Sequence, residues 1–379
     1  MTAGRAGPPA AGTVVVVSGD PGTLLLLGFL VLLVVIVVVA VADMRPRTPR
    51  TPPRPEPISP LPSTGRRPQA AVVVNPTKFP GGLDTLHAEV EATFLSRGWS
   101  PPLWMETTAE DTGRGQTRTA LDAGVDVVLA CGGDGTVRAV GGALAGTGVP
   151  LGLLPAGTGN LLARNLDVPV ADLGRALDVT FTGSDHAIDV GRMLIDRSGR
   201  DRAPEEHAFL VMAGMGFDAA VMIGVEEVLK ARIGPAAYVL SGLQALRGPQ
   251  TKVRIQVDDR KPMTRRMRAV IVGNCGRLVG GVALMPAARV DDGWLDAVVL
   301  SPRGIVSWAA VTWQVVTAAR RGHPRVEHLR CRRLQVVSAS PTEVQLDGDP
   351  LGGARRLVVE VDPGALLVRV PAAPTGVRP

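Results

Sequence analysis

Two glycine-rich segments, each directly after a short apolar run, are the residues of this chain best suited to hold a phosphate. The first reads Gly132-Gly133-Asp134-Gly135-Thr136, followed by Val137 and Arg138, and the second reads Pro155-Ala156-Gly157-Thr158-Gly159-Asn160. Each pattern is typical of a buried strand that ends in a loop and opens a helix. The first backbone N–H groups of a helix have no partner within it and can hold an anion. Glycine matters there because a residue without Cβ lets the backbone approach a phosphate closely.

The pair of segments is more informative than either one alone, since a single glycine-rich turn is as often plain turn chemistry as a ligand site. The chain has no G-x-x-x-x-G-K-[ST] loop and no clean G-x-G-x-x-G with an acid about 20 residues further on. Gly132 and Gly157 lie 25 positions apart, a plausible length for one α/β unit. The spacing predicts one phosphate site built from neighbouring strand ends.

Two acidic turns in the C-terminal half could supply carboxylates for phosphoryl transfer. They are Asp291-Asp292-Gly293 and Asp347-Gly348-Asp349. Transfer of a γ-phosphate needs donors and cations around the phosphate, and a carboxylate that orients and deprotonates an alcohol. Magnesium prefers hard oxygen ligands. From the residues alone, a turn residue at Asp292 and a hairpin turn at Asp347-Gly348 are the simpler interpretations.

Length, charge and composition limit the classes of protein to consider. The 379 residues allow two modest domains, and the formal net charge is +6. Aromatic residues make up 3% of the chain, so no row of aromatics alternates with basic residues as on a stacking nucleic-acid surface. We expect no nucleic-acid partner, and anionic partners such as ATP and acidic lipid head groups instead. Three widely spaced cysteines predict buried, reduced thiols.

Residues 23–42 form an almost wholly apolar run with the length of a membrane-spanning helix. About 20 helical residues cross the hydrocarbon core. A signal peptide is the rival interpretation, because Ala40-Val41-Ala42 resembles a cleavage site, but the apolar core is long and only Arg5 precedes it as a cation. Four arginines follow between residues 45 and 54. The positive-inside rule then predicts a single-pass protein of the cell membrane with its globular part in the cytoplasm.

The remaining sequence divides into segments that differ in composition and hydrophobic pattern. Our predicted boundaries are 1–22 for an extracytoplasmic tail, 23–42 for the transmembrane helix, 43–69 for a Pro/Arg-rich linker, 70–182 for an α/β nucleotide-binding domain, 183–371 for a β-rich substrate and metal domain, and 372–379 for a tail. Strands expected at 70–74, 102–106, 125–131 and 151–155 alternate with helices at about 83–96 and 115–123. This order favours a parallel, doubly wound sheet, whose ligands bind at the carboxyl ends of the strands.

The second domain shows short strand-like runs separated by turn signals, which favours an antiparallel, sandwich-like fold. The expected strands are 187–190, 208–213, 252–257, 267–272, 295–300, 334–338, 343–346, 356–361 and 366–370. Two helices are expected near 218–231 and 303–320. The second, with Trp308 and Trp313, is either a core-packing helix or an interfacial helix that touches membrane.

With these residues in view, the chain resembles the bacterial diacylglycerol kinase and YegS-like lipid kinase family from about residue 70 to 371. Six motifs carry the resemblance in the family's order: Val74–Thr77, Gly132–Thr136, Pro155–Asn160, Gly214–Ala219, Val290–Asp296 and Leu346–Asp349. The glycine motif also resembles the nucleotide loop of NAD kinases and phosphofructokinases. The resemblance supports the expected fold, a doubly wound parallel α/β nucleotide domain followed by an antiparallel β-sandwich-like domain.

The resemblance also implies roles for the matched residues. The nucleotide would be lined by Asn75, Pro76, Thr77 and Thr107, and its phosphates would be wrapped by Gly132 to Arg138 and by Gly157 to Asn160, with Thr158 in contact. Asp292 would bind a magnesium ion with backbone carbonyls near Arg289 and Trp294, and a second magnesium would accompany ATP. Asp347 and Asp349 would lie next to the acceptor hydroxyl, one of them as general base.

The expected function is therefore an ATP-dependent lipid kinase anchored to the membrane, with diacylglycerol as the default acceptor and a homodimer as a possible assembly. One position departs from the family, because its last motif usually ends in Glu and residue 349 is Asp. The carboxylate then sits roughly 1–1.5 Å back, a distance that matters for catalysis. Either Asp347 is the main base, or the loop compensates, or the enzyme is slow. A soluble-substrate kinase of the NAD-kinase type and a catalytically weak nucleotide or lipid sensor are the alternatives.

Overall fold

The computed structural model describes residues 66–200, 204–216, 250–277, 284–301, 326–347 and 349–372. The predicted tail 1–22, the predicted transmembrane helix 23–42, the linker up to residue 65 and the two helices expected near 218–231 and 303–320 lie outside these ranges. Within them, no helix is both long enough and apolar enough to cross a membrane.

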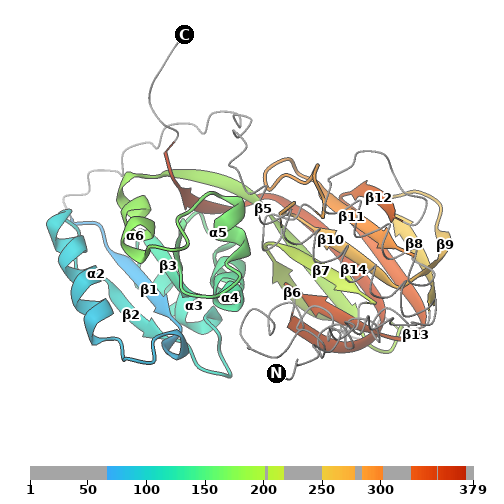
Figure 1. Cartoon of the computed structure of the whole chain (residues 1–379), viewed down its shortest axis with the longest axis horizontal. Helices are drawn as coiled ribbons and strands as arrows, with labels where there is room; N and C mark the ends of the chain where they lie inside the picture. Colours follow the sequence, from blue (N-terminus) through green and yellow to red (C-terminus); the bar gives the residue numbers. More distant parts are fainter. Residues whose placement is uncertain are drawn as a thin grey trace, which may run out of the picture. The chain divides into compact units, whose positions relative to one another are not determined.

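The first described domain is built on four parallel strands in the order β2-β1-β3-β4 (Figure 1). Their bounds are β1 Ala70–Val74, β2 Leu103–Glu106, β3 Val127–Gly132 and β4 Leu151–Pro155. Every residue of β1 and β3 is buried, as expected for strands covered on both faces. The predicted parallel sheet is confirmed.

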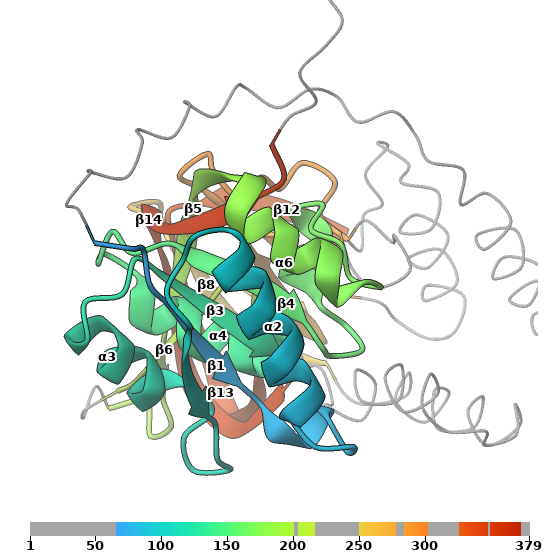
Figure 2. The ribbon, with the colours of Figure 1, turned by 90° about the vertical axis from the view of Figure 1, so that its left-hand side faces the viewer.

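Helices cover both faces of this sheet (Figure 2). On one face, α2 (Asp84–Ser96) meets α6 (Leu173–Thr182) through the rings of Phe94 and Phe181, whose centroids are 4.9 Å apart. On the other, α3 (Arg114–Asp122) packs against α4 (Asp134–Leu144). Two short helices, η1 (Pro76–Lys78) and α5 (Leu161–Asn165), follow the ends of β1 and β4. The helix expected after the second glycine loop is the short α5, whereas α6 and η1 were not predicted from the sequence.

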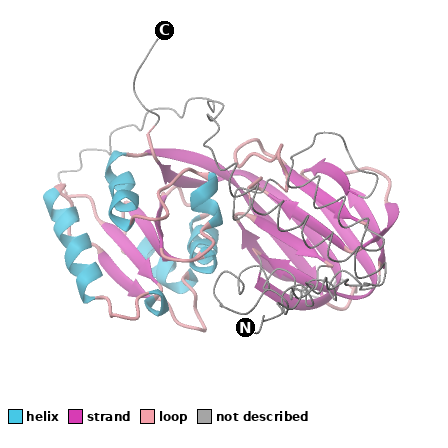
Figure 3. Ribbon diagram, viewed as in Figure 1, coloured by secondary structure: helices cyan, strands magenta, loops and turns pink. Residues whose placement is uncertain are grey.

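The second domain consists, in its described part, of antiparallel strands without helices (Figure 3). Their bounds are β5 Ser184–Asp196, β6 Glu205–Phe209, β7 Met212–Met215, β8 Thr251–Val257, β9 Met263–Met267, β10 Ala269–Gly273, β11 Leu295–Leu300, β12 Val326–Cys331, β13 Arg333–Leu346 and β14 Asp349–Val370. A second apolar core lies among these strands, separate from the core around the parallel sheet. The predicted antiparallel domain is confirmed.

Several predicted strand bounds were wrong because the chain changes partners within an apolar run. The run 267–272 is two strands that meet at Arg268, since β9 pairs with β8 whereas β10 pairs with β7 and β11. The run 208–213 likewise divides into β6 and β7. Conversely, 334–338 and 343–346 are one strand, β13, with an irregular register between Val337 and Thr342.

One strand joins the two domains. The 22-residue strand β14 pairs antiparallel with β13 from Asp349 to Glu360 and with β5 from Arg356 to Val370. Near its end, Val368 pairs in parallel with Leu151 of β4. The two domains therefore share one continuous sheet, with β14 between β13 and β4.

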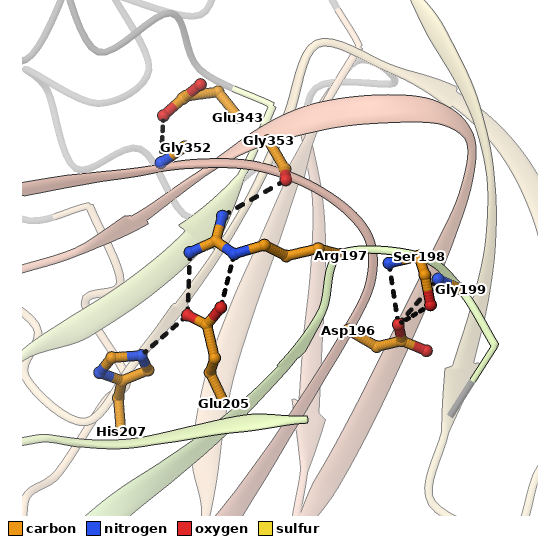
Figure 4. A network of polar contacts seen from close by, with 9 residues as sticks. All are labelled: Asp196, Arg197, Ser198, Gly199, Glu205, His207, Glu343, Gly352 and Gly353. Atoms are coloured by element: carbon orange, nitrogen blue, oxygen red, sulfur yellow. Dashed lines mark hydrogen bonds and ion pairs between the residues drawn. The ribbon is translucent and has the colours of Figure 1, made fainter. Parts of the chain in front are cut away.

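A polar network closes the end of the β5–β6 hairpin (Figure 4). The guanidinium of Arg197 donates from Nε and Nη2 to the two carboxylate oxygens of Glu205 at 2.6 and 2.8 Å, and lowers the pKa of Glu205. Asp196 Oδ1 accepts from the backbone nitrogens of Ser198 and Gly199. These groups stabilise a turn and a hairpin; a solvent-exposed ion pair contributes at most about 1 kcal/mol.

All three cysteines are free and buried, as predicted. Burial raises the pKa of each thiol, so none is poised as a nucleophile at neutral pH.

Candidate active site

The first glycine loop joins β3 to the start of α4. Gly132 ends the strand, and a Cβ added there would lie 2.6 Å from Thr136 Oγ1, so a larger residue would displace the first turn of α4. Gly133 is the N-cap, in an extended conformation and without a side chain over the helix start. Thr136 and Val137 are buried behind the loop. The start of α4, whose first backbone N–H groups have no partner within the helix, therefore lies at the carboxyl edge of the sheet.

The second glycine loop lies directly against the first. A Cβ added at Gly157 would lie 2.6 Å from the Cα of Gly133, and the backbone nitrogen of Ala156 donates to Gly132 O at 2.9 Å. Glycine at position 157 permits this backbone approach, because a larger residue there would collide with Gly133. The structure thus brings the two segments together at one place, and Thr158 is exposed on the second loop.

Two predicted nucleotide residues hold the loops in shape. Asp134 Oδ1 accepts from the backbone nitrogen of Leu161 at 2.6 Å, which ties the first loop to α5. A Cβ at Gly159 would lie 2.5 Å from Asp134 Oδ2. Asn160 adopts a left-handed backbone, φ 48°, and its side-chain amide bonds the nitrogen and the oxygen of Gly157 at 3.1 and 2.7 Å.

The ends of β1 and β2 complete the edge. Asn75 Oδ1 accepts from the nitrogen and the hydroxyl of Thr77 at 3.1 and 2.7 Å, and Pro76 opens the short helix η1. Thr107 is buried, with its nitrogen donating to Val74 O. Sequence reasoning missed Lys78, whose Cε would lie 3.9 Å from a Cβ at Gly133. The available signal was a cation directly after the Asn-Pro motif.

The acidic turn of the second domain reaches this edge. Asp347 follows the end of β13 and Asp349 is the first residue of β14, and Arg138 of α4 contacts both. The distances are 3.0 Å from Arg138 Nη2 to Asp349 Oδ2 and 3.5 Å from Nη1 to Asp347 Oδ2. A Cβ at Gly135 would lie 4.0 Å from Asp349 Oδ2. The structure therefore places both predicted carboxylates beside the start of α4.

The two carboxylates differ in exposure. The Asp347 side chain is 2% exposed and the Asp349 side chain 62% exposed. Asp347 has a left-handed backbone, φ 50°, and exchanges two hydrogen bonds with Met212, from Met212 N to Oδ1 and from Asp347 N to Met212 O, both 2.8 Å. Burial raises the pKa of Asp347 to about 6, against the lowering effects of Arg138 and the Met212 N–H. Asp349 alone is open to a substrate.

The other acidic turn already has its own cation. Arg330 of β12 donates to Asp292 Oδ2 at 2.6 Å, and the nitrogen of Trp294 donates to Oδ1 at 3.1 Å. Arg330 also stacks over the Trp294 ring at 5.1 Å. Arg289, the other residue of the predicted metal site, pairs with Asp291 at 3.2 Å.

The carboxylate of this turn is engaged by protein groups, and magnesium binding by Asp292 with carbonyls near Arg289 and Trp294 stays a prediction. Both oxygens of Asp292 have partners, and the Val290 carbonyl accepts from the nitrogen of Asp189 at 2.6 Å. Across the described ranges, no group of three or more His, Cys, Asp or Glu side chains could hold a metal. The turn is organised by buried Asp189, which sequence reasoning missed and which accepts from the nitrogens of Gly293 and Gly364 at 2.7 and 2.8 Å.

A second missed residue is Gln345. It lies in β13, two positions before Asp347. It is 3% exposed, and neither its amide nitrogen nor its amide oxygen has a hydrogen-bond partner among the described residues. A buried polar group without a partner costs stability and calls for an explanation.

Comparisons with known proteins agree with this arrangement. The chain matches the diacylglycerol kinase catalytic domain over residues 69–193 and the YegS C-terminal NAD kinase beta sandwich-like domain over residues 211–370. A Pseudomonas aeruginosa protein named "Probable lipid kinase YegS-like" is 36% identical over 266 residues, which are 67% of this chain and 79% of the relative. A Staphylococcus saprophyticus diacylglycerol kinase is 26% identical over 294 residues, 75% of this chain and 89% of the relative.

Among solved structures, a diacylglycerol kinase from Bacillus anthracis has a similar fold. The TM-score is 0.58 at 21% sequence identity, over 80% of this chain and 96% of that chain. At this identity the likeness concerns the fold alone.

Proposed function

Because the chain belongs to the family of YegS-like lipid kinases and diacylglycerol kinases, we propose that it transfers the γ-phosphate of ATP to the hydroxyl of a membrane lipid. Diacylglycerol is the default acceptor and phosphatidic acid the product. The observation that carries this proposal is the meeting of the acidic turn with the start of α4, where Arg138 lies 3.0 Å from the exposed carboxylate of Asp349.

The nucleotide is proposed to enter as its magnesium complex and to place its phosphates on the paired glycine loops. The N-terminus of α4 favours negative charge there. Lys78 beside Gly133 and the exposed hydroxyl of Thr158 supply further hydrogen-bond donors. Asp134 and Asn160 act on the nucleotide indirectly, because their side chains hold the loops. The adenosine would lie toward Asn75 and Thr107, at the ends of β1 and β2.

We assign the general base to Asp349 rather than to Asp347. A base must first reach the proton, and only then does its pKa matter. Asp349 is exposed beside the helix start, whereas Asp347 is buried. In the reaction the lipid hydroxyl gives its proton to Asp349, its oxygen bonds to the γ-phosphorus, the bond to the β-phosphate oxygen breaks, and ADP leaves. Gln345 offers the unpaired amide that a hydroxyl or ester carbonyl of the acceptor could use.

The sequence supports a proposal of membrane attachment. We propose that residues 23–42 anchor the protein as a single pass in the cell membrane, with the catalytic part in the cytoplasm. A substrate confined to the bilayer would then meet the enzyme at a raised effective concentration. We also propose that the protein can form a homodimer. Measurement of its molecular mass in detergent tests this.

The test uses the full chain in detergent with γ-labelled ATP, magnesium and separate lipids. The panel holds diacylglycerol, a sphingoid base, an isoprenoid alcohol and, as a soluble acceptor, NAD. We expect label in phosphatidic acid, and none in NAD. The variant Asp349→Asn removes the base, and Asp259→Asn, an exposed carboxylate in the turn between β8 and β9, is the matched control. Label in NAD alone would favour the NAD-kinase alternative, and ATP binding without any labelled product would favour a sensor.

A further inference from the structure

We propose that Arg138 is a positioning residue, which holds the Asp347–Asp349 turn of the second domain against the nucleotide loop of the first, and is not a ligand of the phosphates. The proposal rests on the proposed function above for its catalytic consequence. It corrects the role that the family resemblance implied, in which Arg138 would wrap the phosphates.

The described polar contacts of the Arg138 guanidinium are all with the Asp347–Asp349 turn and with Leu346, the residue before it. Nη1 donates to the Leu346 carbonyl at 3.0 Å and lies 3.5 Å from Asp347 Oδ2, while Nη2 donates to Asp349 Oδ2 at 3.0 Å. Both terminal nitrogens of the guanidinium are thus committed to the acidic turn. The side chain is 18% exposed, so little of it remains for a ligand. A planar fork held in this way fixes direction as well as distance.

The other end of Arg138 is equally fixed. It lies one helical turn after Asp134, which starts α4. Its neighbours Val137 and Val140 are buried in the core, and Gly132 and Gly133 fix the start of the helix. The helix that presents N–H groups to the phosphates therefore also fixes the position of the acidic turn relative to the phosphate site. One rigid element holds both the donor site and the base.

This arrangement explains how the short side chain of Asp349 can act as the general base. Aspartate places its carboxylate further back than the glutamate that usually ends the motif in the family. Arg138 holds that carboxylate beside Gly135, where an added Cβ would lie 4.0 Å from Asp349 Oδ2. A misplacement of about 1 Å at a reacting group can cost about 100-fold in rate. The sequence left three alternatives open, namely that Asp347 is the main base, that the loop compensates for the shorter side chain, or that the enzyme is slow. The contacts of Arg138 favour the second, a turn that compensates for the shorter side chain of Asp349.

The electrostatic surroundings of the turn give a second readout. Asp347 is faced by Arg138 and Asp134 from α4, by the N–H groups of Val211 and Met212, and by Asp349 on its own turn. Cys275, after β10, lies close enough that Asp347 raises the pKa of its thiol. Arg138 is the cation that lowers the pKa of Asp347 in this group. Without it, that carboxyl would hold its proton to a higher pH.

A double-mutant cycle on Arg138 and Asp349 tests the inference in the full chain. Arg138→Met should lower kcat by about 100-fold while the KM for MgATP stays within about threefold. In the Asp349→Asn background, Arg138→Met should cost less than about threefold more, because its effect passes through that carboxylate. Because the pKa of Asp347 should rise without Arg138, the pH dependence of the free energy of unfolding should move to higher pH in Arg138→Met. Arg118→Met, an exposed arginine of α3, is the matched control.

The affinity for a non-hydrolysable ATP analogue with magnesium, measured by calorimetry, tests the same inference without any lipid. We expect a change below about threefold in Arg138→Met; a loss of about tenfold or more would make Arg138 a phosphate ligand and overturn the inference. Multiplicative losses of kcat in the cycle would also overturn it. If Arg138→Met does not fold, Arg138→Lys serves in the kinetic cycle and in the calorimetry, since lysine keeps the charge but not the fork. A wild-type protein that phosphorylates no lipid would overturn the proposed function, while the calorimetric arm still decides the role of Arg138.

Discussion

The two acidic turns of the antiparallel domain have similar sequences and different partners. In the turn at residues 291–293, Asp292 pairs with Arg330 of the neighbouring strand β12, whose side chain is 52% exposed. In the turn at residues 347–349, both aspartates pair with Arg138, which comes from the other domain. The first turn is closed by its own sheet, and the second is held at the edge where the glycine loops meet. The origin of the cation, more than the Asp-Gly sequence, decides which turn can take part in chemistry.

The largest expected difference between the turns is in activity. Asp349→Asn removes the proposed base and should lower kcat by about 10³-fold, since general base catalysis contributes about 10²–10⁴-fold. Asp292→Asn in the other turn should stay within about threefold of the wild type. Steady-state rates with diacylglycerol vesicles and MgATP measure both. Equal losses in the two variants would mean that both turns belong to the active site.

The next largest difference is in stability and concerns Asp347. Its pKa is about 6 in the folded protein against an ordinary 3.8, so the folded state binds the proton more tightly than the unfolded state. The ionised carboxylate therefore reduces stability above pH 6, and this cost fades as the pH falls toward 4. Asp347→Asn should raise the free energy of unfolding at pH 8 by up to roughly 3 kcal/mol.

Urea unfolding at pH 8 and at pH 5 measures this effect. The gain should be smaller at pH 5, where part of the wild-type Asp347 is protonated. Asp292→Asn provides the comparison from the other turn. A loss of stability in Asp347→Asn at pH 8 would show that the carboxylate charge stabilises its turn.

A smaller effect is expected from the arginine of the first turn. Arg330→Ala removes an ion pair that is half open to water and a stacking contact with Trp294, so the loss of stability should be no more than about 1 kcal/mol. Arg330→Lys should recover only part of it, because lysine cannot reproduce the planar contact. Thermal unfolding measures both variants. A loss of several kcal/mol would place this pair among the main supports of the domain.

The smallest expected effect is that of magnesium on the fold. Because Arg330 takes the place of a cation at Asp292, the wild-type unfolding temperature should be the same in EDTA and in millimolar magnesium. In Arg330→Ala, magnesium should raise it slightly, because the freed carboxylate becomes available as an oxygen ligand. Differential scanning calorimetry without nucleotide distinguishes the two cases. A clear fall of the wild-type temperature in EDTA would support the predicted metal site.

The features that could be predicted from the sequence are those written in a local pattern. The glycine loops after β3 and β4 follow from apolar runs that end in residues tolerating a close backbone approach. The helix α6 escaped prediction because residues 173–182 contain Gly174 and several β-branched residues, which are weak helix formers. Its support is tertiary, with Asp172 capping its start and Phe181 packing on Phe94.

Long-range partners could not be predicted in the same way. Arg138 and Asp349 are separated by 211 positions, and nothing in the periodicity of either segment relates them. The same holds for Asp292 and Arg330, which β11 and β12 bring together by pairing. Local sequence patterns therefore identified the side chains that could take part in chemistry. Only the tertiary structure shows which of these side chains already form ion pairs within the protein.

The strand β14 also sets a condition on synthesis. In the described part of the chain β4 has β3 on one side and β14 on the other, and β14 follows every other described strand in the sequence. During synthesis, one edge of β4 therefore stays uncovered until residues near Val368 have left the ribosome and can pair with it. An uncovered strand edge can pair with other chains. Nascent or truncated chains that stop before residue 349 should therefore need chaperone protection or be degraded, although their nucleotide loops are already complete.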